Sequence, residues 1–417
     1  MATKDIERKS VFWNMLFSML QALQSAVMMM ALTHVVSENE AGVLSIAYAT
    51  AYLMYTIGVY GVRDFHATDC QRRFSFEDYR RLRILSCCIM FFCSLLYCFL
   101  KGYDEHKTIV IFLICVLKLE EAVEDLYHGE FQRGGRLDLA GKLGTFRLIL
   151  TYSVFTICLL CTQNVLLAIG VMLIVSFVVI MITRSLLSKM IEKKETNNKV
   201  KVLVNMSLMC FPLFVMLFLS IYINNAPKYA IDIYLSEGEQ AYYAIISMPV
   251  FTINLLSGII YRPHLLYMAE LWNTGNRREF RHHIWKQISN ITIISLMITM
   301  TGLVIGLRIL EILYGVSLSV LKKEFVILLL GGGVVSVYNF FCACLTIIRK
   351  QIVMLGIAIF GMILSGVISN PIVRLAGLTG ASYLYFILMM AELIMVSIAL
   401  FVCIHKKDEK INMDEVE

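Results

Sequence analysis

The chain has 417 residues, of which 59% are hydrophobic and 16% are charged, and its mean hydropathy is +0.73. Soluble domains carry about 25% charged residues, so this composition excludes a water-soluble globular protein, which could not cover so much apolar surface. In a membrane protein the formal net charge of +6 is better explained by orientation in the bilayer than by an acidic partner.

Twelve long apolar stretches follow one another along the chain. An α-helix needs about 20 apolar residues to cross a hydrocarbon core of about 30 Å, and the alternating pattern of a membrane β-barrel is absent. The sequence therefore predicts an all-α polytopic membrane protein. The predicted spans are residues 11–35, 41–61, 84–100, 108–127, 143–162, 165–183, 202–223, 241–261, 287–307, 324–347, 352–370 and 379–404.

The basic residues lie on alternate connections between these spans. One set of segments, which includes both termini, holds 28 of the 37 Lys and Arg residues, whereas the opposite set holds seven. Cytoplasmic loops are enriched in Lys and Arg, so this bias predicts that both termini are cytoplasmic.

A short internal similarity divides the chain into two halves. Ser37-Glu38-Asn39-Glu40 precedes the second span and Ser236-Glu237-Gly238-Glu239 precedes the eighth, 199 residues later. We predict two six-helix bundles related by a pseudo-twofold axis along the membrane normal. The predicted parts are an N-terminal bundle (1–190), a cytoplasmic linker (191–201), a C-terminal bundle (202–404) and a cytoplasmic tail (405–417).

Polar residues form one face of the first span. Asn14, Ser18, Gln21 and Ser25 follow helical spacing, and Gln24 flanks them. Such a face either lines a cavity that binds a polar solute or forms hydrogen bonds between helices, typically worth about 0.6 kcal/mol each in membranes. Both interpretations stay open at this stage.

Aromatic residues form a face of the second span. Tyr48, Tyr52 and Tyr55 lie close together on a helix. Aromatic walls bind the apolar faces of sugar rings, but such residues more often pack in a core or anchor a helix at the interface.

The fourth span carries the densest ionisable cluster. Lys118, Glu121, Asp125 and His128 are predicted on one stripe, with Glu120 and Glu124 on the neighbouring stripe. A charge at the bilayer centre costs at least about 2.5–3.5 kcal/mol, so the cluster must face protein or water. Arg147, early in the fifth span, is placed to pair with Glu124 or Asp125. The cluster is either an ion-pair network or a functional site in which Lys118 binds phosphate or a carboxylate binds H⁺ or Na⁺.

Other polar signals are fewer. Glu392 is a lone carboxylate in the last span, which is protonated, paired or involved in ion coupling. The sequence contains no nucleophile and base arrangement, nucleotide-binding motif, metal-ligand spacing or nucleic-acid module, so we expect neither an enzyme nor a bound cofactor or metal.

Several segments resemble bacterial polysaccharide flippases of the O-antigen and teichoic-acid type, in the multidrug/oligosaccharidyl-lipid/polysaccharide exporter superfamily. The resemblance covers the N-terminal half best. The segments that carry it are Trp13-Asn14, Gln24-Ser25-Ala26, residues 41–49 (AGVLSIAYA), residues 60–63 (YGVR), residues 121–125 (EAVED), His128-Gly129 and Gly135-Arg136-Leu137-Asp138.

The resemblance implies a flippase of the bacterial plasma membrane that moves a polyprenyl-pyrophosphate-linked oligosaccharide to the outer leaflet by alternating access. Its expected partners are this lipid-linked sugar, membrane lipids, H⁺ or Na⁺, and other polysaccharide-assembly proteins. The candidate substrate-binding residues are Asn14, Gln21, Gln24, Lys118 and Arg147, with Arg63 at the cavity mouth, and the candidate ion-coupling residues are Glu121, Glu124, Asp125 and Glu392.

Two alternatives remain beside the flippase. A cation-coupled drug or metabolite exporter would share the architecture but would have an acidic cavity closed to lipid. A membrane enzyme that polymerises or transfers sugars is less favoured, since the outer loops are too short to carry the chemistry.

Overall fold

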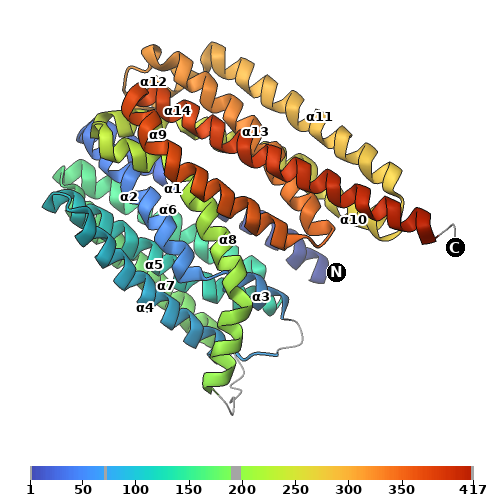
Figure 1. Ribbon diagram of the computed structural model, residues 1–417. Helices are drawn as coiled ribbons and strands as arrows, with labels where there is room; N and C mark the ends of the chain where they lie inside the picture. Colours follow the sequence, from blue (N-terminus) through green and yellow to red (C-terminus); the bar gives the residue numbers. More distant parts are fainter. Residues whose placement is uncertain (1, 70–72, 189–198, 415–417) are drawn as a thin grey trace. The chain divides into compact units, whose positions relative to one another are not determined.

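The computed structural model describes residues 2–69, 73–188 and 199–414, and its secondary structure over these ranges is entirely helical (Figure 1). In chain order the elements are α1 (Ala2–Val35), α2 (Glu38–Val59), α3 (Val62–Thr68), α4 (Phe76–Lys101), α5 (Glu105–Arg133), α6 (Leu137–Thr162), α7 (Val165–Ser188), α8 (Lys199–Tyr234), α9 (Glu237–Tyr261), the 3-10 turn η1 (Arg262–His264), α10 (Leu265–Asn273), α11 (Arg277–Thr301), the π-helical segment η2 (Gly302–Gly306), α12 (Leu307–Tyr314), the 3-10 turn η3 (Ser319–Leu321), α13 (Lys322–Ile347) and α14 (Gln351–Asp414).

The helices account for the predicted spans. Ten segments of the described chain are long and apolar enough to cross a membrane. One of them, Gln351–His405, has 55 residues and is interrupted at Gly377, so it holds the last two predicted spans. The fourth predicted span lies in α5, whose ionisable residues set it apart from the apolar segments. These findings confirm an all-helical, multi-pass membrane protein.

The helices pack into two units, Met1–Ile221 and Tyr222–Glu417. In the first unit, α1 packs along α6, while α5 contacts α2, α4, α6 and α7 and therefore lies at the centre. In the second unit, α13 has the central place, with α9, α11 and α14 against it. The position of α5 explains how a helix with so many charges is accommodated, because other helices rather than lipid surround it.

The similar segments at Ser37 and Ser236 start helices in the same way. The Ser37 hydroxyl accepts a hydrogen bond from the backbone N–H of Glu40, and the Ser236 hydroxyl accepts one from the N–H of Glu239. Glu239 also completes a capping box by accepting a hydrogen bond from the backbone N–H of Ser236. These contacts satisfy N–H groups that a helix start leaves unpaired. The internal similarity thus reflects equivalent helix starts in α2 and α9.

α1 and α6 approach closely at Gly141. A Cβ atom on Gly141 would lie 2.6 Å from the carbonyl carbon of Trp13 and 2.7 Å from the backbone nitrogen of Asn14. Small residues at helix interfaces in membranes allow backbones to come together in this way. The predicted polar face of α1 is therefore partly an interface with α6.

Two predicted boundaries differ from the structure. The outer loop expected near residues 224–240 is mostly helical, because α8 continues to Tyr234 and α9 begins at Glu237. This places Lys228, which was assigned to a loop, on a helix. Residues 191–198 of the predicted linker lie outside the described residues, and residues 199–201 form the first turn of α8.

Candidate functional site

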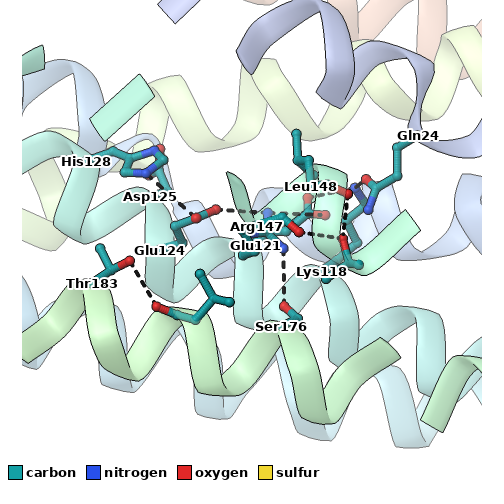
Figure 2. A network of polar contacts seen from close by, with 12 residues as sticks. Gln24, Lys118, Glu121, Glu124, Asp125, His128, Arg147, Leu148, Ser176 and Thr183 are labelled. Atoms are coloured by element: carbon teal, nitrogen blue, oxygen red, sulfur yellow. Dashed lines mark hydrogen bonds and ion pairs between the residues drawn. The ribbon is translucent and has the colours of Figure 1, made fainter. Parts of the chain in front are cut away.

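A charged network surrounds the middle of α5 in the first unit, and Figure 2 shows its residues converging from α1, α5, α6 and α7. The Lys118 Nζ donates hydrogen bonds to Oε1 of Gln24 at 2.8 Å and to Oε2 of Glu121 at 2.7 Å. Lys118 is fully buried and Gln24 is 1% exposed. A buried ammonium is tolerated only with such partners, so Gln24 and Glu121 hold Lys118 in its charged form.

The tyrosines of α2 complete the surroundings of this lysine. The Lys118 Nζ lies 4.1 Å from the ring centroid of Tyr52 and 5.4 Å from that of Tyr48. The Tyr48 hydroxyl contacts the sulfur of Met28 at 2.9 Å. Cation–π contacts of this kind stabilise a desolvated cation by about 2 kcal/mol. In this conformation the two aromatic side chains pack around Lys118.

Arg147 of α6 forms the second half of the network. Its Nη2 lies 2.8 Å from Oε2 of Glu124 and 3.9 Å from Oε1 of Glu121, while Nη1 donates a hydrogen bond to the Ser176 hydroxyl at 3.2 Å. His128 Nε2 lies 3.7 Å from the other oxygen of Glu124. The predicted pairing of Arg147 with Glu124 is confirmed. Two buried cations thus face two buried carboxylates. This pairing offsets most of the free energy that burial of the positive or the negative charges alone would cost.

Asp125 belongs to a different set of contacts. Its two carboxylate oxygens accept hydrogen bonds from Arg63 of α3 at 2.7 Å and from Arg83 of α4 at 2.8 Å. Arg83 also donates to the carbonyl oxygen of Gly58 at 2.8 Å, and its side chain is only 2% exposed. Asp125 is on the same stripe of α5 as Lys118 but has its own partners, since seven residues of helix separate the two by about 10 Å along the axis.

A third group of charged residues follows at the ends of α3, α4 and α5. His66 Nε2 lies 2.8 Å from Oε2 of Glu130, which also pairs with Arg133 at 2.7 Å. The His66 ring stacks on Tyr79 at 4.1 Å between centroids. The Tyr79 hydroxyl donates to Asp69 at 3.2 Å. These contacts tie the short helix α3 to the two longer ones.

Burial and hydrogen bonding shift the ionisation of this third group. Burial lowers the pKa of the His66 imidazole, and the hydrogen bond with Glu130 only partly offsets that effect. Burial would raise the pKa of the Asp69 carboxyl, but the backbone amides of Arg73 and Phe74 and the Tyr79 hydroxyl stabilise the carboxylate, so this pKa lies below its usual value.

The polar residues of α1 have different surroundings. Gln24 is in the network with Lys118, whereas Gln21 is half-buried and carries no such contact. Asn14 is half-buried beside Gly141, and its carbonyl oxygen accepts a hydrogen bond from Ser18. The structure therefore brings Gln24, Lys118 and Arg147 together and leaves Asn14 and Gln21 apart from them.

The second unit contains a cavity of about 310 Å³ between α8, α9, α13 and α14, with polar and apolar side chains in its lining. Lys228 is its one charged lining residue among the described residues, and its ammonium has no ion pair in that part of the chain. Asn254 at the cavity accepts a hydrogen bond from Asn339 at 3.0 Å. The other lining residues are Asn224, Asn225, Tyr243, Ser247, Val250, Phe251, Leu328, Val335 and Tyr385. A cationic, amide-rich and aromatic lining suits an anionic or hydroxyl-rich solute.

Glu392 of α14 is the buried carboxylate of the second unit that the sequence indicated. It is 2% exposed, packs against Gly361, and its Oε1 has no hydrogen-bond partner among the described residues. An unpaired buried carboxylate is costly in its charged form and therefore favours a bound proton.

Sequence reasoning missed Arg83, His66 and Lys228. Arg83 and His66 lie in the connection between the second and third predicted spans, and their partners come from α5, 42 and 64 residues later in the chain. Lys228 lies within residues 224–240, which the sequence predicted as an outer loop, whereas α8 continues to Tyr234.

No protein-family model and no curated protein matches this sequence, whereas solved structures match it closely in fold. A variant of the Vibrio cholerae MATE transporter VcmN matches with a TM-score of 0.62 and 13% identity over 98% of both chains. The lipid II flippase MurJ, in an inward closed conformation, gives 0.70 and 12% identity over 93% of this chain and 87% of its own. A MOP superfamily transporter from Pyrococcus furiosus, noted for reverse polarity of its binding pocket, gives 0.51 and 12% identity over 97% and 95%. The chain has the fold of these transporters.

Proposed function

We propose that this chain is a flippase that moves a polyprenyl-pyrophosphate-linked oligosaccharide from the inner to the outer leaflet of a bacterial plasma membrane by alternating access. The observation that carries this proposal is the cavity of the second unit, which offers Lys228, amides and tyrosines and has no carboxylate among its described lining residues. An exporter of cationic drugs would need the opposite polarity.

The physical task explains this chemistry. An oligosaccharide carries many hydroxyl groups and a pyrophosphate carries negative charge, so neither crosses hydrocarbon unaided. Amide side chains and tyrosine hydroxyls replace hydrogen bonds to water, aromatic rings contact the apolar faces of sugars, and a lysine compensates phosphate charge. The lipid tail needs no such help and remains in the bilayer.

The network of the first unit supplies a way to couple protons to cargo. Lys118 and Arg147 are held by Glu121 and Glu124, so neither cation is free for phosphate in this conformation. Protonation of a carboxylate would release its cation for a pyrophosphate oxygen, and phosphate departure would restore the ion pair. In this proposal Lys118, Arg147, Gln24 and Arg63 act on the cargo, together with Asn14 and Gln21. Glu121, Glu124 and Asp125 carry the coupling charge.

A second candidate function is a cation-coupled exporter of drugs or metabolites with the same fold. The observation that favours it is Glu392, whose buried carboxylate oxygen lacks a partner among the described residues and is suited to bind a proton during each cycle.

The purified protein in liposomes separates the two candidates. The assay follows the transfer of a fluorescent polyprenyl-pyrophosphate oligosaccharide between leaflets. The flippase proposal expects transfer by the wild type and a loss of about tenfold or more in Lys228→Gln, since a charge-assisted hydrogen bond contributes about 1.5–3 kcal/mol. The matched control is Lys350→Gln, which removes an exposed lysine of the same unit. Absence of lipid transfer together with H⁺- or Na⁺-driven efflux of a drug would reject the flippase in favour of the exporter.

A further inference from the structure

The first unit has a second hollow, separate from its charged network. It is a groove of about 890 Å³ lined by α4, α5 and α7, within the range of about 300–1,000 Å³ typical of ligand sites. Three of its lining residues are arginines, Arg80, Arg83 and Arg184, one is the carboxylate Glu77, and most of the others are apolar or aromatic, so the net charge of the lining is positive. A ligand that fits both parts must combine a negative charge with a hydrocarbon portion.

The arginines lie at one end of the groove, because Arg80 and Arg83 are in the first turns of α4 and Arg184 is in the last turns of α7. These helix ends belong to the segments that the Lys and Arg distribution assigns to the cytoplasmic side. At this end the groove therefore lies at the level of lipid headgroups of the inner leaflet.

The three arginines are only partly paired within the described part of the protein. Arg80 pairs with Glu77, but Arg184 is exposed and has no ion pair among the described residues. Arg83 is 2% exposed, and its Nε has no hydrogen-bond partner in the described chain although the other nitrogens are bound. A buried N–H without a protein partner can donate a hydrogen bond to a water or a ligand.

The remaining wall of the groove suits a hydrocarbon chain. Ile84, Cys88, Phe91 and Phe92 follow helical spacing along α4 and continue away from the arginines. Ile84 is 55% exposed and Phe92 is 67% exposed, at a depth where acyl chains rather than water surround the helix.

We propose that this groove binds an anionic phospholipid of the inner leaflet. Its phosphate lies between Arg80 and Arg184 and supplies an acceptor near Arg83, while one acyl chain follows the apolar wall of α4. The site goes beyond the proposed transport function, since a resident bilayer lipid rather than the cargo occupies it.

Arg83 gives this lipid a route to the charged network. The same guanidinium that lines the groove holds Asp125 at 2.8 Å and the carbonyl oxygen of Gly58 at 2.8 Å. A phosphate beside Arg83 adds a hydrogen-bond acceptor on the groove side. It thereby holds the Arg83 side chain in the rotamer that binds Asp125. The bound lipid therefore stabilises the contacts that Arg83 of α4 makes with Asp125 of α5 and with Gly58 of α2.

The test measures lipid binding without transport. The purified full-length protein is exchanged into phosphatidylcholine nanodiscs with and without phosphatidylglycerol, and retained lipids are counted by native mass spectrometry. Alkylation of Cys88, an exposed thiol in the groove, is followed by peptide mapping. We expect selective retention of phosphatidylglycerol and slower alkylation of Cys88 in its presence.

Variants locate the site. Arg184→Gln removes an exposed side chain at a helix end and is expected to weaken phosphatidylglycerol binding about fivefold, following the contribution of about 1 kcal/mol per basic residue near an anionic lipid surface. Arg80→Gln combined with Arg184→Gln is expected to weaken it about 25-fold by the same reasoning. The matched control Arg278→Gln, an exposed arginine in the second unit, should bind as the wild type does.

Three outcomes would overturn the proposal. They are equal retention of phosphatidylcholine, equal weakening in Arg278→Gln, and displacement of phosphatidylglycerol only by polyprenyl pyrophosphate, which would make the groove a cargo entrance. If the protein retains phosphatidylglycerol selectively but does not transfer oligosaccharide, the lipid site stands and only the flippase proposal is rejected.

Discussion

The guanidinium of Arg147 and the carboxylate of Glu124 lie 2.8 Å apart, and neither side chain is more than 2% exposed. Such a pair contributes little net stability relative to well-packed apolar residues, but loss of one partner leaves a charge with neither water nor counterion. Its main consequence is that the two residues depend on each other.

Mutation of Arg147 alone therefore has a different effect from mutation of the pair. We expect Arg147→Met to destabilise the protein by about 3–5 kcal/mol, because it strands Glu124, and Arg147→Met with Glu124→Gln to recover most of that loss. Thermal unfolding of the purified protein in detergent measures both. Equal destabilisation in the single and double variants would contradict a direct pairing.

Lys118 should be required for transport but not for insertion. Lys118→Ala removes the cation between Gln24 and Glu121, so we expect impaired export at a matched level of folded protein in the membrane. Arg147→Ala, although less stable because it leaves Glu124 unpaired, should also impair export when the level of folded protein is matched. Surface polysaccharide in a strain that depends on this chain measures export. Normal polysaccharide in both variants would show that these cations have no part in transport.

The close approach at Gly141 predicts a large effect of a single methyl group. Gly141→Ala places a carbon 2.6 Å from the backbone of Trp13, so α1 and α6 must separate, and we expect a loss of thermal stability of about 1–3 kcal/mol. Gly170→Ala is the matched control, since its Cβ meets nothing within 4 Å and the substitution improves helix propensity. If Gly170→Ala proves as harmful as Gly141→Ala, the interface is not the cause.

His66 predicts a pH dependence of stability. Burial lowers the pKa of His66 in the folded protein, so the unfolded chain binds a proton near the usual value of about 6.5 while the folded protein does not. The contribution of neutral His66 to the free energy of unfolding is therefore present above this pH, and it is lost as the pH falls toward the pKa of His66 in the folded protein. Unfolding midpoints measured between pH 7.5 and pH 5 should fall less in His66→Gln than in the wild type. An identical fall in both proteins would assign the pH dependence to other groups.

The sequence predicted the membrane-spanning helices because length and apolarity decide a bilayer crossing. It also predicted that Arg147 would pair with Glu124 or Asp125, since α5 and α6 are neighbours in the chain and the hydrocarbon core forces their charges inward, and the structure has the pair with Glu124. The partners of Asp125 could not be predicted in this way. Arg83 pairs with it from α4, in a register that only tertiary packing determines, whereas the sequence offered Arg147 as its possible partner.

The cavity around Lys228 escaped prediction for a related reason. A lysine near the end of an apolar stretch is usually a loop residue or an interfacial anchor, so the sequence favoured a turn there. Asn224 and Asn225 lie beside Lys228 on α8, but the rest of its polar environment comes from Tyr243 and Asn254 of α9 and from Tyr385 of α14, which are farther along the chain. Their convergence is a property of tertiary structure.

The break at Gly377 makes α14 turn back on itself. Without it, the 64 residues of α14 would form a rod of about 96 Å at 1.5 Å per residue, about three times the hydrocarbon thickness. At Gly377 the backbone has φ 56° and ψ −137°, a conformation essentially restricted to glycine, and beyond it Gly380 comes back against the carbonyl oxygen of Ile372. A side chain at this one position would oppose the reversal that returns the C-terminus to the face from which the last pair of crossings begins.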